Sequence, residues 1–415
     1  MSVQPLLSIC VPSRNRQFYF QETIKALTAS LRPDIEFVFV DNSDDPTIMD
    51  EFIQPYLADP RVKFIPSGER VRPMMDNWEV AAEATTGQWI NFIGDDDYID
   101  PDVAELIRRI IAVDPDVEAI DWARLNYYWA DQNRIPRGRP VPMGTAIHRV
   151  PKSVLYERTF RWASAKSVLS SGFSLYHGAI SRPFVERTRK AFGGRYFTHP
   201  VVDYDSLMKN ITLGTNFVYI SRPQSVLGAC PKSSTATIGS HIKGDKAQAD
   251  FHAEHVVPMD DWPCYADWPF HSSLGVTACI GMVHHWFGKT FGYRFDGFEE
   301  NFARACARQC EDSDNLSEFD YYSGLYHKAF ASWKGGKYLK HFNPVYSGWE
   351  KADPFTGFSE NNVYVHEGSP FTQTASDFYR FCEGILVPSS EIEIDLEKTI
   401  VDTRTATDRR HRQSA

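Results

Sequence analysis

Residues 89–101 read WINFIGDDDYIDP, an apolar run that leads directly into three consecutive aspartates. Apart from Asn91, Trp89–Ile93 has the length and hydrophobicity of a strand that is buried on both faces. Further apolar runs of this kind lie on either side of it: Leu6–Val11, Ile35–Val40, Val62–Ile65 and Val117–Trp122. Because segments with helical periodicity separate these runs, the sequence predicts an α/β fold, with a mixed, mainly parallel sheet flanked by helices on both faces.

Apolar residues recur at helical spacing in two of the connecting segments: Phe20, Ile24, Leu27 and Leu31 in the first, and Val103, Leu106, Ile107, Ile110 and Ile111 in the second. Pro33 ends the first predicted helix, and Pro101 stands near the start of the second, where a missing N–H costs little. In sheets of this type a ligand binds at the carboxyl ends of the strands. The residues that follow each apolar run are therefore the first candidates for a functional site.

The chain has 415 residues, more than the roughly 150 of an average domain. We expect a first domain over residues 1–240, whose less regular second half contains a helix near Tyr204–Leu213 and a strand at Phe217–Ile220. Residues 241–397 predict a mostly helical, aromatic-rich second domain, and residues 398–415 predict a disordered tail. The helices of this second domain are expected at Gly244–His255, Ser272–Phe291, Gly297–Cys310 and Ser317–Trp333.

Composition narrows the class of protein. Hydrophobic residues make up 42% of the chain, which is typical of a globular protein, and the formal net charge is -10. That charge argues against a broad nucleic-acid-binding surface, because a phosphate backbone is repelled by it. The sequence starts with neither a basic segment nor a long apolar one, and no window is long and apolar enough for a transmembrane helix. We therefore expect a cytoplasmic protein.

The three aspartates Asp95, Asp96 and Asp97 are the strongest chemical signal in the chain. Adjacent carboxylates repel one another, so a cation or a donor-rich ligand is needed to stabilise them at the end of a buried strand. Mg²⁺ and Mn²⁺ prefer one or two carboxylates together with phosphate oxygens of a substrate. The alternative interpretation is an acidic turn that only caps the following helix.

Other polar residues follow the neighbouring strands. Asp41 ends the run Ile35–Val40 and could accept hydrogen bonds from a base or a ribose, although it could equally close the strand with an Asx turn. Arg72 lies before a predicted helix that contains Asn77, and its guanidinium suits bidentate contact with phosphate. The first strand leads into Pro12, Ser13, Arg14, Asn15 and Arg16, which supply donors to the same edge of the sheet.

Together these segments resemble the family 2 glycosyltransferases, which are inverting nucleotide-sugar enzymes of GT-A fold, over roughly residues 5–235. LSICVPSRN (7–15) is similar to that family's first strand and nucleotide loop, and FVFVDNS (37–43) is similar to its second strand. The resemblance implies that Asp41 contacts the nucleobase and that Arg72 contacts the diphosphate. It also implies a Mn²⁺ or Mg²⁺ cofactor, a UDP-sugar as donor and a glycan or other hydroxyl compound as acceptor. Residues 241–397 would then serve the acceptor side or self-association.

GQWINFIGDDD (87–97) resembles the segment that carries the family's Asp-x-Asp metal motif. Aligning this motif on Pro101 puts Gly94 where the first Asp usually stands. The resemblance then implies metal binding by Asp96, helped by Asp97, with Asp95 next to the ribose. A shift of one residue would make Asp95 and Asp97 the pair instead.

The family's general base is an Asp at the start of a helix, and THPVVDYDSLMK (198–209) occupies the corresponding place. The resemblance assigns this role to Asp203, with Asp205 as the reserve candidate, although an Asp at a helix start is also a common N-cap. After the strand Phe217–Ile220, Lys232 stands where the family carries a basic residue near the diphosphate. Neither membrane helices nor the Gln-x-x-Arg-Trp string of the processive synthases is present, so a single-addition enzyme, as in bacterial surface glycan assembly, is expected.

Two alternatives remain open. A nucleotidyltransferase that makes sugar nucleotides also uses an α/β sheet and Asp-bound Mg²⁺, but it needs a glycine-rich loop after the first strand, and residues 12–15 contain no glycine. A glycan-binding protein that lost transfer activity is the other alternative. Gly94 and Val202, which replace acidic residues of the family pattern, favour it.

Overall fold

The computed structural model describes residues 4–130, 137–233, 259–348, 355–359 and 361–399. The helix predicted at Gly244–His255 and most of the predicted tail lie outside the described residues. Within the described residues, no helix is long and apolar enough to cross a lipid bilayer.

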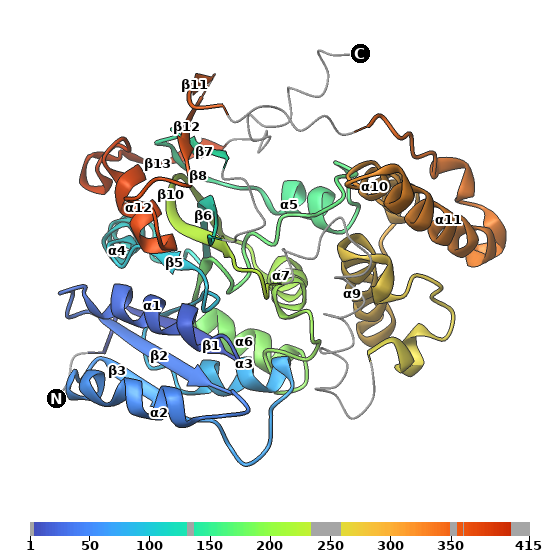
Figure 1. Cartoon of the computed structure of the whole chain (residues 1–415). Helices are drawn as coiled ribbons and strands as arrows, with labels where there is room; N and C mark the ends of the chain where they lie inside the picture. The colour runs from blue at the N-terminus through green and yellow to red at the C-terminus, as the bar shows by residue number, and fades with distance from the viewer. Residues whose placement is uncertain (1–3, 131–136, 234–258, 349–354, 360, 400–415) are drawn as a thin grey trace.

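A single large sheet forms the centre of the molecule, in the order β13-β8-β10-β6-β9-β4-β1-β2-β3, with β5 paired to β10 (Figure 1). The strand pairs from β3 to β4 are parallel, as is β6 with β10, whereas β9 runs antiparallel between β4 and β6. The sheet is therefore mixed and mainly parallel, as predicted. Its strands are β1 (Leu7–Ser13), β2 (Ile35–Asp41), β3 (Val62–Ile65), β4 (Trp89–Phe92), β5 (Tyr98–Ile99), β6 (Ala119–Tyr128), β8 (Ile147–Arg149), β9 (Gly178–Ser181), β10 (Phe217–Ala229) and β13 (Ile394–Thr399).

Helices cover both faces of this sheet. Alternate residues of β2 point to opposite faces, so that Phe37 and Phe39 pack in one hydrophobic core and Val38 and Val40 in the other. The first core contains residues of α1 (Gln17–Thr28), α2 (Thr47–Ile53), α4 (Val103–Val113) and α12 (Ala375–Glu383). The second contains residues of α3 (Met74–Glu83), α5 (Lys152–Thr159), α6 (Arg182–Ala191) and α7 (Val202–Leu213).

The two apolar helix faces predicted from the sequence are confirmed, with one exception. Phe20, Ile24 and Leu27 are buried in α1, but Leu31 is 94% exposed because the helix already ends at Thr28. In α4 the predicted face is buried, apart from Ile111, which is half-buried.

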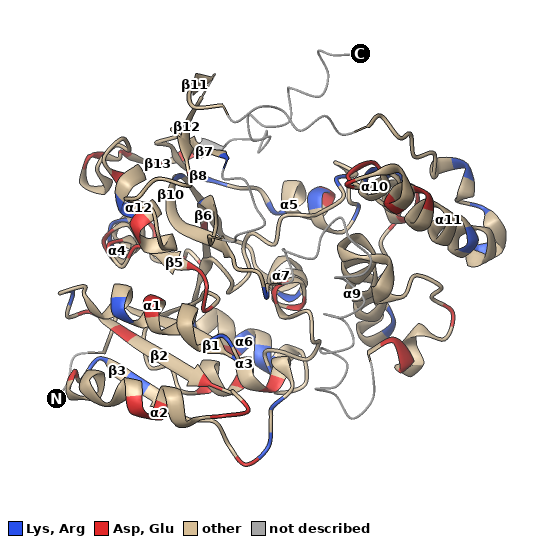
Figure 2. Cartoon of the chain, viewed as in Figure 1, with Lys and Arg blue, Asp and Glu red and all other residues tan. Residues whose placement is uncertain are grey.

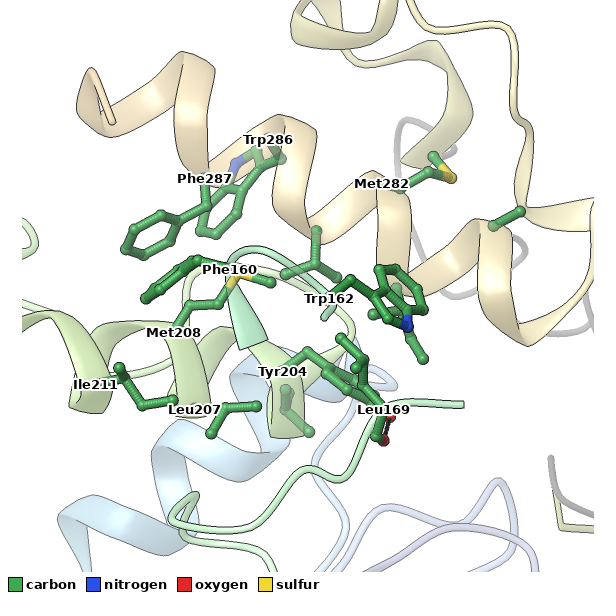
Figure 3. Packing of buried hydrophobic residues seen from close by; sticks show 14 of the residues in the cluster. Phe160, Trp162, Leu169, Tyr204, Leu207, Met208, Ile211, Met282, Trp286 and Phe287 are labelled. Carbon is green, nitrogen blue, oxygen red and sulfur yellow. Dashed lines mark hydrogen bonds between the residues drawn. The ribbon is translucent and has the colours of Figure 1, made fainter. Parts of the chain in front are cut away.

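An appended helical region follows the sheet domain and consists of α9 (Val276–Phe291), α10 (Phe298–Glu311) and α11 (Leu316–Ser332). Leu207, Met208 and Ile211 of α7 belong to the same hydrophobic core as Trp286 and Phe287 of α9 (Figure 3). The appended helices therefore continue the core of the sheet domain. Short 3₁₀ helices are η1 (Gln54–Ala58), η3 (Met259–Asp261), η4 (Pro263–Tyr265), η5 (Ser272–Leu274), η6 (Trp333–Gly336), η7 (Leu339–His341) and η8 (Ser389–Glu391).

The end of the chain returns to the sheet domain, which differs from the predicted division at residue 240. β13 pairs with β8, and α12 packs on β10, β5 and β6. A small second sheet joins β7 (Gly138–Pro142) to β12 (Asn362–His366) and β11 (Gly357–Ser359). The physical reason is that β8 would otherwise be an open edge strand, and the returning segment covers it. Residues 398 and 399, predicted to be part of the tail, belong to β13.

Candidate active site

The residues that follow β1, β2 and β4 lie at one edge of the sheet, as the strand-end rule predicts. β1 pairs in parallel with both neighbours, and its last pairs are Ser13 with Asp41 and Cys10 with Phe92. Acidic residues gather at this edge, at the end of β2 and in the segment between β4 and β5 (Figure 2). The edge therefore holds the predicted nucleotide and metal residues together.

The loop after β1 is joined to the loop after β2. Pro12 and Ser13 are the last residues of β1, and both are buried. Asn15 Nδ2 donates to Asp44 Oδ2 at 2.9 Å, and the Asp44 N–H donates back to Asn15 Oδ1 at 3.0 Å. Arg14 forms an ion pair with Asp44 at 3.3 Å. Asn15 has a φ of 55°, a left-handed conformation that Asn adopts more readily than most residues.

Asp41 is fully buried at the end of β2. Its Oδ1 accepts from the N–H and hydroxyl of Ser43, at 3.1 and 2.6 Å, and its Oδ2 accepts from the Ser67 hydroxyl at 3.2 Å. Burial raises the pKa of Asp41, although these hydrogen bonds oppose the change. Asp41 thus forms an Asx turn, which was the alternative to a contact with a base or a ribose. The side chains of Ser43 and Ser67 contact its carboxylate.

Arg72 is held at the same edge by Asn42. The Asn42 side chain donates to the Arg72 carbonyl at 2.8 Å and accepts from its backbone N–H at 2.9 Å. The Arg72 guanidinium in turn donates to the Asn77 side-chain oxygen at 3.4 Å. The structure therefore brings Arg72 and Asn77 together next to the end of β2.

Asp95 and Asp96 are buried on either side of a guanidinium. Arg16 places Nη2 2.8 Å from Asp95 Oδ1 and Nη1 3.4 Å from Asp96 Oδ1. Ser13 Oγ donates to Asp95 Oδ2 at 2.6 Å, and the Cys230 N–H donates to Asp96 Oδ2 at 2.9 Å. Burial raises the pKa of Asp95 to about 7 and also raises that of Asp96, while the charge of Arg16 opposes both changes. Repulsion between the neighbouring carboxylates adds to the increase.

Asp97 is surrounded by protein donors. Its Oδ2 accepts from the Gly94 N–H at 2.6 Å and the Tyr176 hydroxyl at 2.8 Å, and it lies 2.9 Å from His177 Nε2. Its Oδ1 accepts from the Gly228 N–H at 2.7 Å. Burial opposes ionisation, but the charge and hydrogen bonds around this carboxylate lower its pKa below the ordinary value. Asp97 therefore connects the end of β4 to β10 and to the segment before β9.

Both predicted metal ligands are engaged by the protein. Asp96 contacts Arg16 through Oδ1 and the Cys230 N–H through Oδ2, whereas Asp97 is held by four protein groups. Asp96 has fewer protein partners than Asp97, and the metal role of both residues stays a prediction. Among the described residues, no group of three or more His, Cys, Asp or Glu side chains is arranged to hold an ion without other ligands.

The structure also gives a reason for Gly94, which departs from the family pattern. A Cβ atom at this position would lie 2.9 Å from Asp97 Oδ2 and 3.2 Å from Asp96 Oδ1. Glycine therefore allows these two carboxylates to approach the backbone at the end of β4.

Asp203 lies in the first turn of α7, where the N-cap residue is Val201. Asp203 is therefore not the N-cap of this helix. Its side chain keeps part of its surface exposed, yet burial raises its pKa to about 6, against the opposing effects of nearby backbone N–H groups and Arg124. Besides burial, the charges of Asp97, Asp96 and Asp203 all raise the pKa of Tyr176, so Asp203 is near enough to Tyr176 for its charge to act there.

Asp205, the reserve candidate, is bound inside the protein. Its carboxylate lies 2.8 Å from Lys209 Nζ, and both side chains are fully buried. It also accepts from the backbone N–H groups of Thr198 and His199, at 2.7 and 3.1 Å. Burial raises the pKa of Asp205 and lowers that of Lys209, although their pairing opposes both changes. Asp205 is thus held in a buried ion pair with Lys209, whereas Asp203 has no ion-pair partner within 4.0 Å among the described residues.

Lys232 follows β10 and is exposed, with Nζ donating to the Asn15 carbonyl at 3.2 Å. Three residues that the motifs did not identify also belong to this site. Arg16 was noted in the sequence only as a donor, whereas Tyr176 and His177 lie in a segment without a recognisable pattern. The positive φ of 53° at His177 is a property of the folded backbone that its residue type alone does not predict.

Part of the chain resembles a known protein family. Residues 8–180 match the family model of glycosyl transferase family 2. A comparison with curated proteins finds no match. Among solved structures, residues 1–349 of TarS from S. aureus share 13% identity, over 81% of this chain and 88% of that one, with a TM-score of 0.39.

Complexes of the same TarS fragment give similar values. The complex with UDP-GlcNAc shares 12% identity over 81% of this chain and 89% of that chain, with a TM-score of 0.41. The complex with UDP shares 13% identity over 86% of this chain and 98% of that chain, also with a TM-score of 0.41. The family match spans β1 to β9 and includes Asp41, Arg72 and the three consecutive aspartates. Residues 8–180 are therefore similar to glycosyl transferase family 2.

Proposed function

We propose that this protein is an inverting glycosyltransferase that moves one sugar from a nucleoside-diphosphate sugar to a hydroxyl acceptor. The observation that supports this proposal is the meeting of separate chain segments at one edge of the sheet. The donor residues Asp41, Arg72 and Asp96 lie there, and Tyr176 interacts electrostatically with both Asp96 and Asp203.

The donor binds, in this proposal, across the ends of β1, β2 and β4. Asp41 and its loop receive the base, while Arg72 and Lys232 provide positive charge for the diphosphate. Asp95 lies next to the ribose. We take UDP-sugars as the first donor class to test.

A divalent cation at Asp96 would supply positive charge that stabilises the leaving diphosphate. The part played by the protein does not depend on the identity of that ion. Arg16 already holds a positive charge against Asp95 and Asp96, and the Cys230 N–H fixes the second oxygen of Asp96. Asp97 positions this edge through Tyr176, His177 and the backbone of β10.

Asp203 acts as the general base. It accepts the proton of the acceptor hydroxyl while the acceptor oxygen forms a bond to the anomeric carbon from the side opposite the diphosphate. The bond between that carbon and the diphosphate oxygen breaks, and its electron pair stays with the diphosphate. A carboxylate with a pKa of about 6 is mostly ionised at neutral pH and is basic enough to assist this step.

We also propose that the enzyme adds single sugars, since its sequence lacks the Gln-x-x-Arg-Trp string of processive synthases. The region α9–α11 is proposed to lie on the acceptor side, because α9 packs against α7, the helix that carries Asp203.

A donor screen tests the proposed function. UDP-, GDP- and dTDP-sugars are incubated with the protein and Mn²⁺, and the released nucleoside diphosphate is measured. Because a base that activates a hydroxyl also activates water, slow donor hydrolysis is expected without an added acceptor. We expect turnover of one donor class, and its loss in Asp203→Asn. Release that does not exceed the Asp203→Asn background for any donor would overturn the proposal.

A further inference from the structure

Two arginines lie close enough to Tyr204, the residue after the proposed base, for their charges to act on it. Arg124 belongs to β6 and Arg158 to α5, a helix that packs against α7 (Figure 1). Both side chains keep part of their surface exposed. Arg124 lowers the pKa of Asp203 against the larger effect of burial, so its guanidinium acts directly on the proposed base.

Arg124 has a carboxylate partner. Its Nη2 lies 3.1 Å from Asp121 Oδ1, and the Asp121 side chain is only 4% exposed. The other oxygen of Asp121 is covered by the backbone, because a Cβ atom at Gly172 would lie 2.3 Å from Asp121 Oδ2. Both oxygens of Asp121 therefore already have neighbours, Arg124 on one side and the backbone at Gly172 on the other.

Arg158 has no carboxylate within ion-pair distance among the described residues. Its Nη2 donates to the Gly172 carbonyl at 3.3 Å, and its guanidinium carbon lies 5.9 Å from the centre of the Phe173 ring. Its Nε is buried and has no hydrogen-bond partner in the described part of the chain. Burial lowers the pKa of Arg158, and repulsion from Arg124 lowers it further, while Asp121 and nearby tyrosines oppose the change.

The Arg158 side chain is partly exposed, but its buried Nε is an unused donor, which is unfavourable unless a ligand supplies the missing acceptor. Carboxylate and phosphate groups are the ligands that a guanidinium binds best, because two parallel hydrogen bonds form. Asp121 is bound to Arg124, and Arg158 has no carboxylate partner among the described residues, so Arg158 keeps a donor for a further anion.

We propose that Arg158 and Arg124 bind a carboxylate or phosphate group of the sugar substrates next to Asp203. This inference rests on the proposed function. It narrows the substrates to those in which the donor sugar or the acceptor carries an anionic group close to the reacting hydroxyl.

The two sources of the anion are separated by titration calorimetry in the presence of Mg²⁺. UDP-glucose and UDP-glucuronate differ only at C6, where a hydroxymethyl group is replaced by a carboxylate. If the donor carries the anion, we expect UDP-glucuronate to bind at least about tenfold more tightly than UDP-glucose, because charge-assisted hydrogen bonds are strong. If the acceptor carries it, both donors bind equally, and inorganic phosphate binds to the UDP-saturated protein.

Arg158→Gln should remove the preference for UDP-glucuronate in the first case and the binding of phosphate in the second. In both cases the affinity for UDP should stay unchanged. Arg161→Gln is the matched control, because Arg161 follows the same helix, is 45% exposed and pairs only with Glu157 among the described residues. Arg124→Gln gives a second, independent variant if Arg158→Gln does not fold.

Equal binding of the two donors together with no phosphate binding would overturn the proposal. A lower melting temperature of Arg158→Gln with unchanged ligand preference would also overturn it, since it would show that Arg158 only stabilises the fold. Failure of the proposed function gives a different result, because UDP itself would then not bind to the wild-type protein.

Discussion

Replacing Asp203 with Asn removes the proposed base and changes the shape of the side chain very little. Asp203 lies in the first turn of α7 and is not its N-cap, so the helix keeps its start. Asp203 has no ion-pair partner within 4.0 Å among the described residues. The substitution should therefore act on the chemistry and leave the fold intact.

The size of the effect follows from the role of a general base. Such a group contributes about 10²- to 10⁴-fold in rate, or about 3–5 kcal/mol of transition-state stabilisation. With a pKa of about 6, Asp203 is about nine-tenths ionised at pH 7. We expect kcat of Asp203→Asn to fall by about 10²- to 10⁴-fold while the KM for the donor changes little.

The pH dependence gives a second readout of the same group. A base works only when it is deprotonated, so wild-type kcat/KM should rise as pH increases through about 6 and level off above about 7. At pH 5 it should be about one-tenth of the plateau. Asp203→Asn should lack this rise, which is measured from released diphosphate between pH 5 and 8.

Stability should change in the opposite direction to activity. Because burial raises the pKa of Asp203 from 3.8 to about 6, its charged form destabilises the fold at neutral pH, by up to about 3 kcal/mol. This penalty is absent below pH about 4 and complete above pH about 6. Asp203→Asn should therefore melt at the same or a higher temperature. Full turnover in a stably folded Asp203→Asn protein would refute the assignment of the base.

Three further predictions concern the carboxylates with structural or metal roles. Asp205→Ala leaves Lys209 buried without its partner and should lower the free energy of unfolding by about 3–5 kcal/mol in urea denaturation, whereas near-wild-type stability would contradict the structural role. Asp97→Asn should remove stability that is present above pH about 4, since the pKa of Asp97 is lowered in the fold and its contribution is lost as pH falls. Melting temperatures of both proteins between pH 3 and 7 check this prediction. The same fall in melting temperature toward pH 3 in both proteins would contradict it. Asp96→Asn should remove the dependence of UDP affinity on Mn²⁺ while the protein stays folded, and a retained dependence would move the metal to another carboxylate.

Much of the fold follows from periodicity in the sequence. The apolar runs predicted as strands all lie in the sheet, because a strand buried on both faces needs a largely apolar run. The strand-end rule also placed Asp41 and Asp95–Asp97 at one edge correctly. The prediction that Leu31 lies on the first helix was wrong, because α1 ends at Thr28. The spacing of apolar residues alone does not show where a helix ends.

Long-range contacts were harder to predict. β13 and α12 return to the first domain through contacts that span more than 150 residues, such as the Arg222 Nε hydrogen bond to the Val387 carbonyl. Tyr176 and His177 reach Asp97 from a segment that has no periodic pattern, since its backbone is set by the folded neighbours. Asp203 and Asp205 share similar sequence surroundings, and only their burial and partners separate a candidate base from a structural ion pair.

Calorimetric titration of UDP into the wild-type protein, with Mn²⁺ and again after chelation by EDTA, tests the central claim most directly. The claim is that the edge formed by Asp41, Arg72 and Asp96 binds a nucleoside diphosphate together with a divalent cation. We predict saturable binding at one site with Mn²⁺ and markedly weaker binding after chelation. Absence of UDP, GDP and dTDP binding under both conditions would contradict the claim.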